Sequence, residues 1–188
     1  FFLLLFTALA FDGFGQTTIK YNNFDNTGNW ALVYNTGTKF TGSSTASDRP
    51  ASKSFSVGTS VGDSAYGKSN GSAHLTFQNV SGLGSYTSKY VEFRVASWSL
   101  GVTNNGADAA DSITISITTD NGSNWFKTAR VGGSTGNNIW WYYTASSTGS
   151  ATFDGDNTPT DFILTGSGEK IDGYSTIRIN IPDGATQV

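Results

Sequence analysis

The sequence contains no cysteine, no methionine and a single histidine, His74. Without cysteine the chain cannot form disulfides, so its stability must come from packing or from a bound ion. Zinc and iron sites in proteins are built mainly from thiolate and imidazole ligands. The composition therefore argues against a zinc or iron centre.

Charge is also scarce. Charged residues make up 13 % of the chain, and the formal net charge is −3. Lys and Arg are scattered, whereas nucleic-acid binding needs clustered cations that displace phosphate counterions. We expect no nucleic-acid partner.

One long apolar run is present, at the N-terminus (residues 1–11). As a helix it would cross only about half of the ~30 Å hydrocarbon layer, so it predicts no membrane span. Small residues follow it, which indicates a signal peptide over residues 1–15, truncated at its start and cleaved before Gln16. This predicts export to an extracellular or cell-surface location. An N-terminal hydrophobic strand is the alternative.

The rest of the chain shows no sustained helical periodicity, and Gly, Ser, Thr and Asn interrupt it every few residues. About ten short strands separated by turn signals predict an all-β domain over residues 16–188: a two-sheet antiparallel β-sandwich of jelly-roll type. The strand near 174–181 is followed by a turn, so Gln187 and Val188 should enter a further strand. We therefore expect the sandwich to lack its last strand through truncation and to be incomplete at its C-terminus.

Two strands have a clear alternation of apolar and polar residues. Around residue 92 it predicts Val91, Phe93 and Val95 facing the core and Glu92 pairing across strands with a cation. The second strand places Ile113, Ile115 and Ile117 on one buried face. It is followed by Asn121 and Gly122, the dipeptide that best forms a tight hairpin turn.

The eight residues that begin at Thr118 and end at Trp125 resemble an Asp-box, the pattern Ser/Thr-x-Asp-x-Gly-x-x-Trp of sialidase-type propellers and other secreted β proteins. The resemblance implies that Asp120 accepts backbone hydrogen bonds within the turn and that Trp125 packs beneath it. A propeller needs several repeated blades. A single copy of the motif therefore predicts a folding device and not sialidase chemistry.

A wider resemblance rests on three stretches: Ile19, Tyr21, Phe24, Asp25 and Trp30; then Tyr90 to Val95; and finally Ile177 to Ala185. Together with the Asp-box they resemble the jelly-roll modules of secreted, multidomain bacterial proteins of the type IX secretion class. The opening stretch also resembles the start of a MAM-type sandwich. This resemblance implies an accessory module within a larger secreted or cell-surface protein.

Loop carboxylates could hold a structural calcium ion, because Ca²⁺ takes six to eight oxygen ligands. Such sites are typical of the jelly-roll modules that the chain resembles. The alternative is that these residues are solvated turn residues, since Asp favours turns through local hydrogen bonds. The candidate ligands are Asp25, Asp108, Asp111, Asp154 and Asp156.

The densest aromatic run alternates as a strand, so its two pairs face opposite ways. Exposed flat aromatic rings stack on sugar rings, which makes a polysaccharide or cell-surface glycan the predicted ligand. The alternative is that the rings fill the core and cover a loop. The candidate ligand-binding residues are Trp98, Trp140, Trp141, Tyr142 and Tyr143.

Catalysis is not expected. A nucleophile triad would need His74, which the alternation places on an outward strand face, and Glu92 and Glu169 have simpler roles in a strand and a loop. The sequence predicts a non-catalytic extracellular binding or adhesion module that binds carbohydrate. The alternatives are a structural spacer with protein contacts only, or an accessory N-terminal domain of an extracellular nuclease, protease or glycosidase.

Overall fold

The computed structural model describes residues 17–22, 28–41, 64–67, 71–95, 108–133, 148–163 and 175–188. Almost all of the regular structure in these residues is β-strand, with one short 3-10 helix, so the all-β prediction is confirmed. The elements are β1 (Leu32–Asn35), β2 (Thr38–Thr41), β3 (Ser64–Gly67), β4 (Leu75–Phe77), η1 (Leu83–Ser85), β5 (Lys89–Val95), β6 (Ser112–Ile117), β7 (Phe126–Gly132), β8 (Thr148–Thr152), β9 (Thr160–Ile163) and β10 (Ser175–Ile181).

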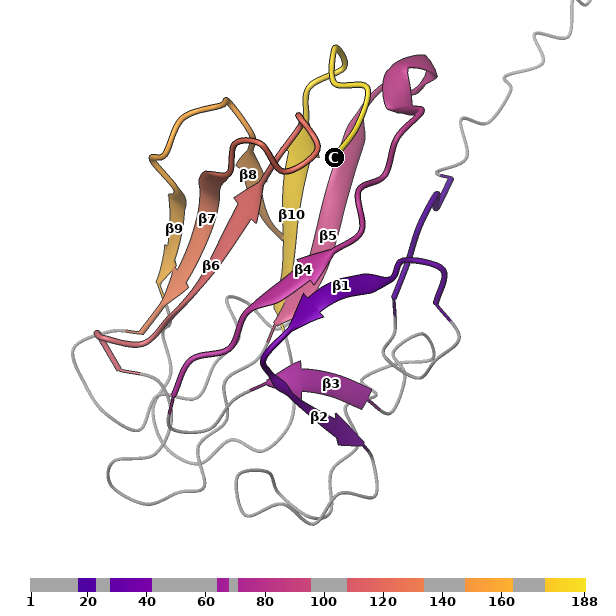
Figure 1. The fold of residues 1–188 in the computed structure, drawn as a ribbon. Coiled ribbons are helices and arrows are strands. Elements are labelled where there is room, and N and C mark those ends of the chain that lie inside the picture. Colours follow the sequence, from indigo (N-terminus) through magenta and orange to yellow (C-terminus); the bar gives the residue numbers. More distant parts are fainter. Residues whose placement is uncertain are drawn as a thin grey trace, which may run out of the picture.

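The described strands form two three-stranded sheets and two strand pairs, β1–β4 and β2–β3 (Figure 1). In one three-stranded sheet β10 lies between β5 and β8, and in the other β7 lies between β6 and β9. Each central strand has one antiparallel and one parallel neighbour. The expectation of purely antiparallel sheets is therefore wrong for β8 and β9.

The parallel pairs arise because the chain changes sheets at each step from β7 to β10. A strand that returns to a sheet after one excursion to the other runs in its original direction, so it lies parallel to its predecessor. The alternation of apolar residues along a strand reports which face is buried, but not which strand is the partner.

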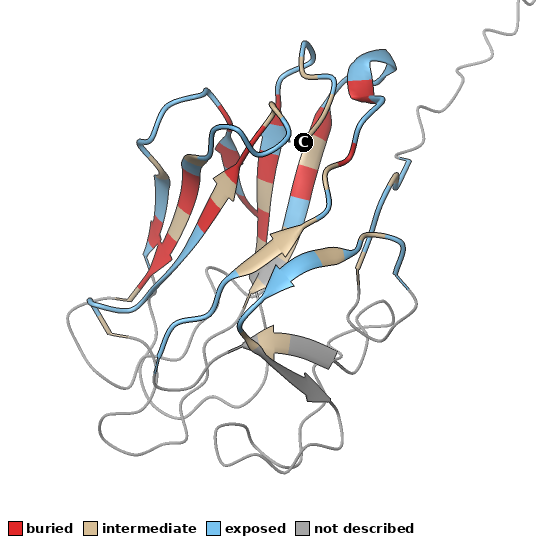
Figure 2. Ribbon diagram, viewed as in Figure 1, coloured by how far each residue is buried: buried red, intermediate tan, exposed pale blue. Residues whose placement is uncertain are grey.

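One hydrophobic cluster takes its residues from both three-stranded sheets (Figure 2). Ile177 and Ile179 on the central strand β10 are its largest fully buried side chains. Trp30, just before β1, packs against the cluster from outside the two sheets. The buried members are Val91, Ile115, Ile117, Ala129, Val131, Ala151, Phe153, Phe162, Ile177, Ile179 and Ile181.

The two sheets approach closely at Gly149 on β8. A β-carbon at this position would lie 2.8 Å from Cε1 of Phe162 on β9 and 3.1 Å from Cδ1 of Ile177 on β10. Residues 144–150 are polar and low in complexity, and this composition predicts a surface loop. That prediction is wrong from Thr148 onward, since the contact between the sheets requires a residue without a side chain here.

The predicted alternation holds for most positions. Val91 is buried, and Phe93 and Val95 pack against the core. Ile115 and Ile117 are also buried, but Ile113 is 41 % exposed, which the alternation did not predict. Among the described residues β6 has no second neighbouring strand, so nothing covers Ile113 from that side.

Candidate functional site

The hairpin turn between β6 and β7 has the geometry that its sequence predicts. Asn121 and Gly122 have φ angles of 59° and 84°, and the N–H of Ser123 donates to the carbonyl oxygen of Asp120 at 3.4 Å. Two consecutive residues with positive φ define the turn type that matches the twist of paired strands. The hairpin prediction is confirmed.

The carboxylate of Asp120 is the hydrogen-bond acceptor at the centre of this turn. Oδ1 accepts from the Asn124 N–H at 2.9 Å and from the Thr118 hydroxyl at 2.7 Å, and Oδ2 accepts from Asn124 Nδ2 at 2.6 Å. The bond from the Asn124 N–H, followed by those from the two side chains, lowers the pKa of Asp120 from 3.8 to about 2. The role that the Asp-box resemblance implied for Asp120 is confirmed.

Trp125 ends the motif and lies against the turn. Its Nε1 and Cζ2 are the atoms that a β-carbon on Gly122 would meet, at 3.7 and 3.8 Å. The indole is nevertheless 47 % exposed, so it packs beside the turn and is not buried beneath it. The next residue, Phe126, points into the protein and makes an edge-to-face contact with Phe153 at 5.8 Å between ring centroids.

A polar loop, residues 154–158, lies against the beginning of β7. Asn157 Oδ1 accepts the N–H of Lys127 at 3.1 Å, so this loop is fastened two residues beyond Trp125. Within the loop Asp154 accepts the N–H of Asp156, and Asp156 accepts the N–H of Thr158. The loop, which carries carboxylate and amide groups, is thus attached to the strand that directly follows the exposed indole of Trp125.

The other acidic candidates lie elsewhere. Asp108 and Asp111 form a turn just before β6, in which Asp108 Oδ1 accepts the N–H of Ala110 and Asp111 Oδ2 accepts the N–H of Asp108. The loop 154–158 lies near the opposite end of that strand pair, beside the start of β7. The structure therefore does not bring Asp108 and Asp111 together with Asp154 and Asp156.

In the described part of the chain, no group of three or more His, Asp or Glu side chains is arranged to hold a metal ion. The carboxylates at 108, 111, 154 and 156 bond to nearby backbone N–H groups, which is the arrangement expected for turn residues. Asp25 lies outside the described residues, as do Trp98, Trp140, Trp141, Tyr142 and Tyr143. The calcium site and the aromatic platform therefore stay predictions.

His74 is exposed, as predicted for an outward strand position. Its Nε2 lies 3.2 Å from the Thr76 hydroxyl, and its ring makes an edge-on contact with Tyr34 at 5.2 Å between centroids. His74 directly precedes β4, so these contacts give the imidazole one neighbour on β4 and one on β1.

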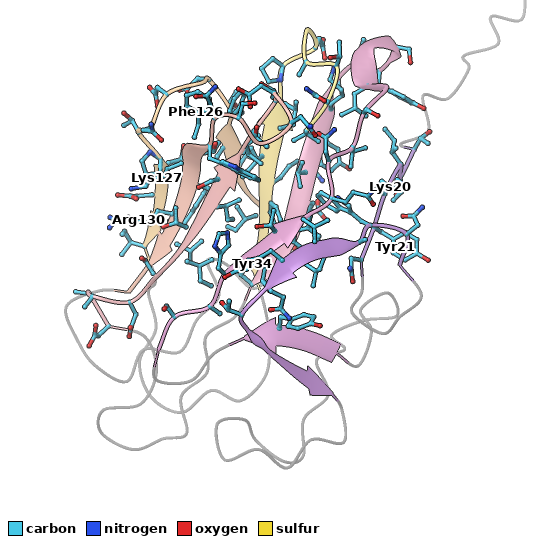
Figure 3. All side chains as sticks on the ribbon, viewed as in Figure 1. Lys20, Tyr21, Tyr34, Phe126, Lys127 and Arg130 are labelled. Carbon is cyan, nitrogen blue, oxygen red and sulfur yellow. The ribbon has the colours of Figure 1, made fainter. Side chains whose placement is uncertain are left out.

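Among the side chains that the structure describes, an arginine–carboxylate pair bridges neighbouring strands in each three-stranded sheet. Arg178 on β10 donates to Glu92 on β5 at 2.9 Å, which confirms the predicted pairing of Glu92 with a cation, and its guanidinium lies 4.0 Å from the centre of the Tyr90 ring. Arg130 on β7 forms two hydrogen bonds with Asp161 on β9, at 2.8 and 2.9 Å. Figure 3 shows Lys127 and Arg130 on the side of β7 that faces away from β10.

The hydrogen bonds between Arg130 and Asp161 raise the pKa of Arg130 and lower that of Asp161. Nothing in the sequence indicated this pair. Arg130 and Asp161 are neighbours because β7 and β9 pair in parallel, and the register of two parallel strands cannot be inferred from local residue spacing. Arg130 and Arg178 belong to different sheets.

A buried lysine was also not predicted. Lys89, at the start of β5, is 9 % exposed, and its Nζ donates to the carbonyl oxygens of Asp183 at 2.6 Å, Tyr86 at 3.1 Å and Leu83 at 3.4 Å. Three carbonyl partners match the three N–H donors of an ammonium group. The partner at Asp183 is 94 residues away, so no local pattern could have revealed it.

Comparison of this chain with protein-family models, with curated proteins and with solved structures found no match. The described residues contain no helix of the length and apolar character that crossing a membrane requires. The function must therefore be argued from the geometry of the chain itself.

Proposed function

We propose that this chain is a non-catalytic binding module of an exported or cell-surface protein and that its ligand is carbohydrate. The observation that carries the proposal is the half-exposed indole of Trp125 on the Asp-box hairpin. An indole offers a flat apolar surface to the C–H groups of a sugar ring, and its N–H can donate to a hydroxyl.

Two features of the surroundings support this assignment. The hydrogen bonds of Asp120 to Thr118 and Asn124 hold the turn in one conformation, so ligand binding would require little further ordering. The loop 154–158 adds carboxylate and amide oxygens fastened to β7 through Asn157. Groups of this kind accept hydrogen bonds from sugar hydroxyls.

We further propose that the two three-stranded sheets are the layers of a jelly-roll sandwich, as in the secreted type IX class modules that the sequence resembles. The support is the cluster that both sheets share and the close contact of Gly149 with Phe162 and Ile177. In such an arrangement the hairpin and the loop 154–158 belong to one end of the sandwich, where connections between strands gather.

A glycan array probed with the chain and with its Trp125→Ala variant tests the function. We expect the native chain to bind a defined set of glycans and Trp125→Ala to lose about tenfold or more in affinity, with little change in melting temperature. Tyr86→Ala is the matched control, because Tyr86 is also an exposed aromatic residue carried by a turn. This control should bind like the native chain.

The predicted aromatic run supplies a second arm of the experiment. If Trp140→Ala or Trp141→Ala abolishes binding while Trp125→Ala does not, carbohydrate binding stands but its location at the hairpin is wrong. If the native chain binds no glycan, the carbohydrate proposal is wrong and the role of a spacer with protein contacts takes its place.

A further inference from the structure

The turn between β6 and β7 contains a chemically labile dipeptide. An asparagine followed by glycine loses its side-chain amide more readily than other asparagines, because glycine has no side chain to obstruct attack by its own backbone nitrogen. Asn121 and Gly122 form such a pair, at the two positions of the turn that have positive φ. Asn121 is exposed, so water and base reach its side chain.

The loss of the amide proceeds through a cyclic imide. The Gly122 nitrogen gives up its proton to base and attacks Cγ of Asn121. A new bond forms between that nitrogen and Cγ, the bond from Cγ to Nδ2 breaks, and Nδ2 leaves as ammonia. The imide then takes up one water molecule and opens to aspartate or, where water attacks the backbone carbonyl carbon, to isoaspartate. The reaction consumes only water and needs no oxidant or reductant.

In the folded chain the attacking nitrogen is held in a hydrogen bond. The Gly122 N–H donates to the Thr118 hydroxyl oxygen at 3.0 Å, and the Thr118 hydroxyl donates its own proton to Asp120 Oδ1 at 2.7 Å. Cyclisation requires the peptide group between Asn121 and Gly122 to rotate toward the Asn121 side chain, and it requires the N–H to lose its proton. The bond to Thr118 opposes both steps, because it fixes the direction of the N–H and stabilises its protonated form.

Side-chain hydrogen bonds hold this turn more closely than its backbone does. The backbone bond that closes it, from the Ser123 N–H to the Asp120 carbonyl oxygen, is long at 3.4 Å, whereas the Asp120 carboxylate accepts from Thr118 at 2.7 Å and from Asn124 at 2.9 Å. The pKa of Asp120 is lowered from 3.8 to about 2, so the carboxylate is ionised at neutral pH. Its negative charge also disfavours a second negative charge on the Gly122 nitrogen.

Reaction at this position would disrupt the hairpin. Isoaspartate adds a methylene group to the main chain between residues 121 and 122. The length of a hairpin loop fixes the register of its two strands, so the longer main chain would disturb the pairing of β6 with β7. The indole of Trp125, whose Nε1 a β-carbon on Gly122 would meet at 3.7 Å, lies against the altered residues.

We propose that Asn121 is a latent deamidation site and that the Thr118 hydroxyl keeps it unreactive in the folded protein. Thr118 acts as a positioning residue, since it restrains the Gly122 nitrogen and takes no part in the bonds that form or break. It is 7 % exposed, so little water competes for its hydroxyl. The proposal does not depend on carbohydrate binding, because what is measured is the covalent state of residue 121.

Peptide mapping by mass spectrometry of the complete chain, aged in mildly alkaline buffer, measures the reaction from the mass gained when an amino group is replaced by a hydroxyl. The sequence supplies reference dipeptides at Asn70–Gly71 and Asn105–Gly106. In concentrated urea the local sequence sets the rate, so Asn121 should react about as fast as these references. In the folded chain Asn121 should react more slowly than in urea, by about tenfold or more.

Substitutions at Thr118 test the role of its hydroxyl. Thr118→Val keeps the shape of the side chain without the oxygen, and it should accelerate the reaction of Asn121 in the folded chain by about tenfold, toward the rate in urea. Thr118→Ser keeps the hydroxyl and should react as slowly as the native chain. Circular dichroism shows whether each variant folds. If Thr118→Val does not fold, Asp120→Ala replaces it, because this variant removes the acceptor that orients the hydroxyl and should also accelerate the reaction.

Two further variants are matched controls. Ser123→Ala removes a second hydroxyl of the turn, which bonds to the Asp120 carbonyl oxygen and not to Gly122, so Asn121 should react at the native rate. Ile177→Val lowers the stability of the whole fold through a fully buried side chain and leaves the turn unchanged. It should also leave the rate at Asn121 near that of the native chain.

Three results would overturn the proposal. One is an equal rate at Asn121 in the folded native chain and in urea, because the turn would then give no protection. Another is an equal rate in the folded Thr118 variant that lacks the hydroxyl, or in its Asp120→Ala replacement, and in Ser123→Ala. The third is an equal acceleration by Ile177→Val, because global unfolding and not the Thr118 hydroxyl would then control the reaction.

Discussion

In each three-stranded sheet the central strand has one antiparallel and one parallel neighbour, but the antiparallel pairs of the two sheets are held by different interactions. In the β6–β7–β9 sheet the antiparallel pair is a hairpin closed by the Asp120 turn, whose hydrogen bonds join residues within four positions of each other. In the β5–β10–β8 sheet the antiparallel pair joins strands about 80 residues apart, and Lys89 fastens its end to carbonyls up to 94 residues away. Local sequence thus specifies the antiparallel pair of one sheet, and tertiary contacts specify the antiparallel pair of the other.

The largest expected effect on stability comes from removing the hydrogen bonds of the Lys89 ammonium group. Lys89→Met keeps the length of the side chain but leaves the carbonyls of Leu83, Tyr86 and Asp183 without their donor, so we expect the free energy of unfolding to fall by about 3 kcal/mol in urea denaturation. The matched control is Lys127→Met, since Lys127 is exposed on β7. Similar losses for the two variants would contradict a special role for Lys89.

The contact between the two sheets should give the next largest effect. Gly149→Ala inserts a methyl group into the space filled by Phe162 and Ile177, and overpacking of this kind costs about 2 kcal/mol. Gly184→Ala is the control, because a β-carbon at Gly184 meets nothing within 4 Å. Thermal melting of both variants measures the difference, and equal stability of the two would show that the sheets separate easily at Gly149.

The local turn should contribute less, and its contribution should depend on pH. The folded-state pKa of Asp120 is lowered from 3.8 to about 2, so its stabilisation is present above about pH 4 and is lost as the pH falls to about 2. Asp120→Asn should therefore melt below the native chain at pH 7, and the gap should close between pH 4 and pH 2.

Ser123→Ala provides the comparison for that titration. It removes the hydroxyl that bonds to the Asp120 carbonyl oxygen but no ionisable group, so its effect on melting temperature should not vary over the same pH range. A gap between the native chain and Asp120→Asn that persists at pH 2 would mean that the carboxylate charge is not what stabilises the turn.

The smallest effects should come from the two arginine–carboxylate pairs. Glu92→Gln and Asp161→Asn each weaken a cross-strand pair that solvent reaches, and exposed pairs contribute little to stability. We expect small decreases in melting temperature that shrink further in 1 M salt. A large, salt-insensitive decrease in only one variant would show that its sheet depends on the pair.

The sequence predicted the features that depend on near neighbours. Asn121 and Gly122 indicated the turn, because few other residues accept positive φ. The alternation around Val91 and Ile115 indicated buried strand faces, because successive side chains of a strand point to opposite sides. The pairing of Glu92 with a cation followed from its place on an outward face, although its partner, Arg178, could not be named in advance.

The features that the sequence did not predict depend on distant parts of the chain. Gly149 lies in a strand because two sheets meet there, whereas its own preference is for a loop. Ile113 is exposed because β6 lacks a described neighbour on one side, which its alternation with Ile115 cannot report. The half-exposed Trp125 belongs to the same class, since the resemblance to an Asp-box implied only packing for it.

By itself the sequence determined an all-β chain, the hairpin around Asp120 and the buried faces of β5 and β6, because turn chemistry and side-chain alternation act over a few residues. Only the tertiary structure decided that β8 and β9 run parallel to their partners, that Lys89 bonds to three distant carbonyls and that Arg130 meets Asp161. These features depend on contacts between residues far apart in the chain, and such contacts form only when burial of a shared core brings the strands together.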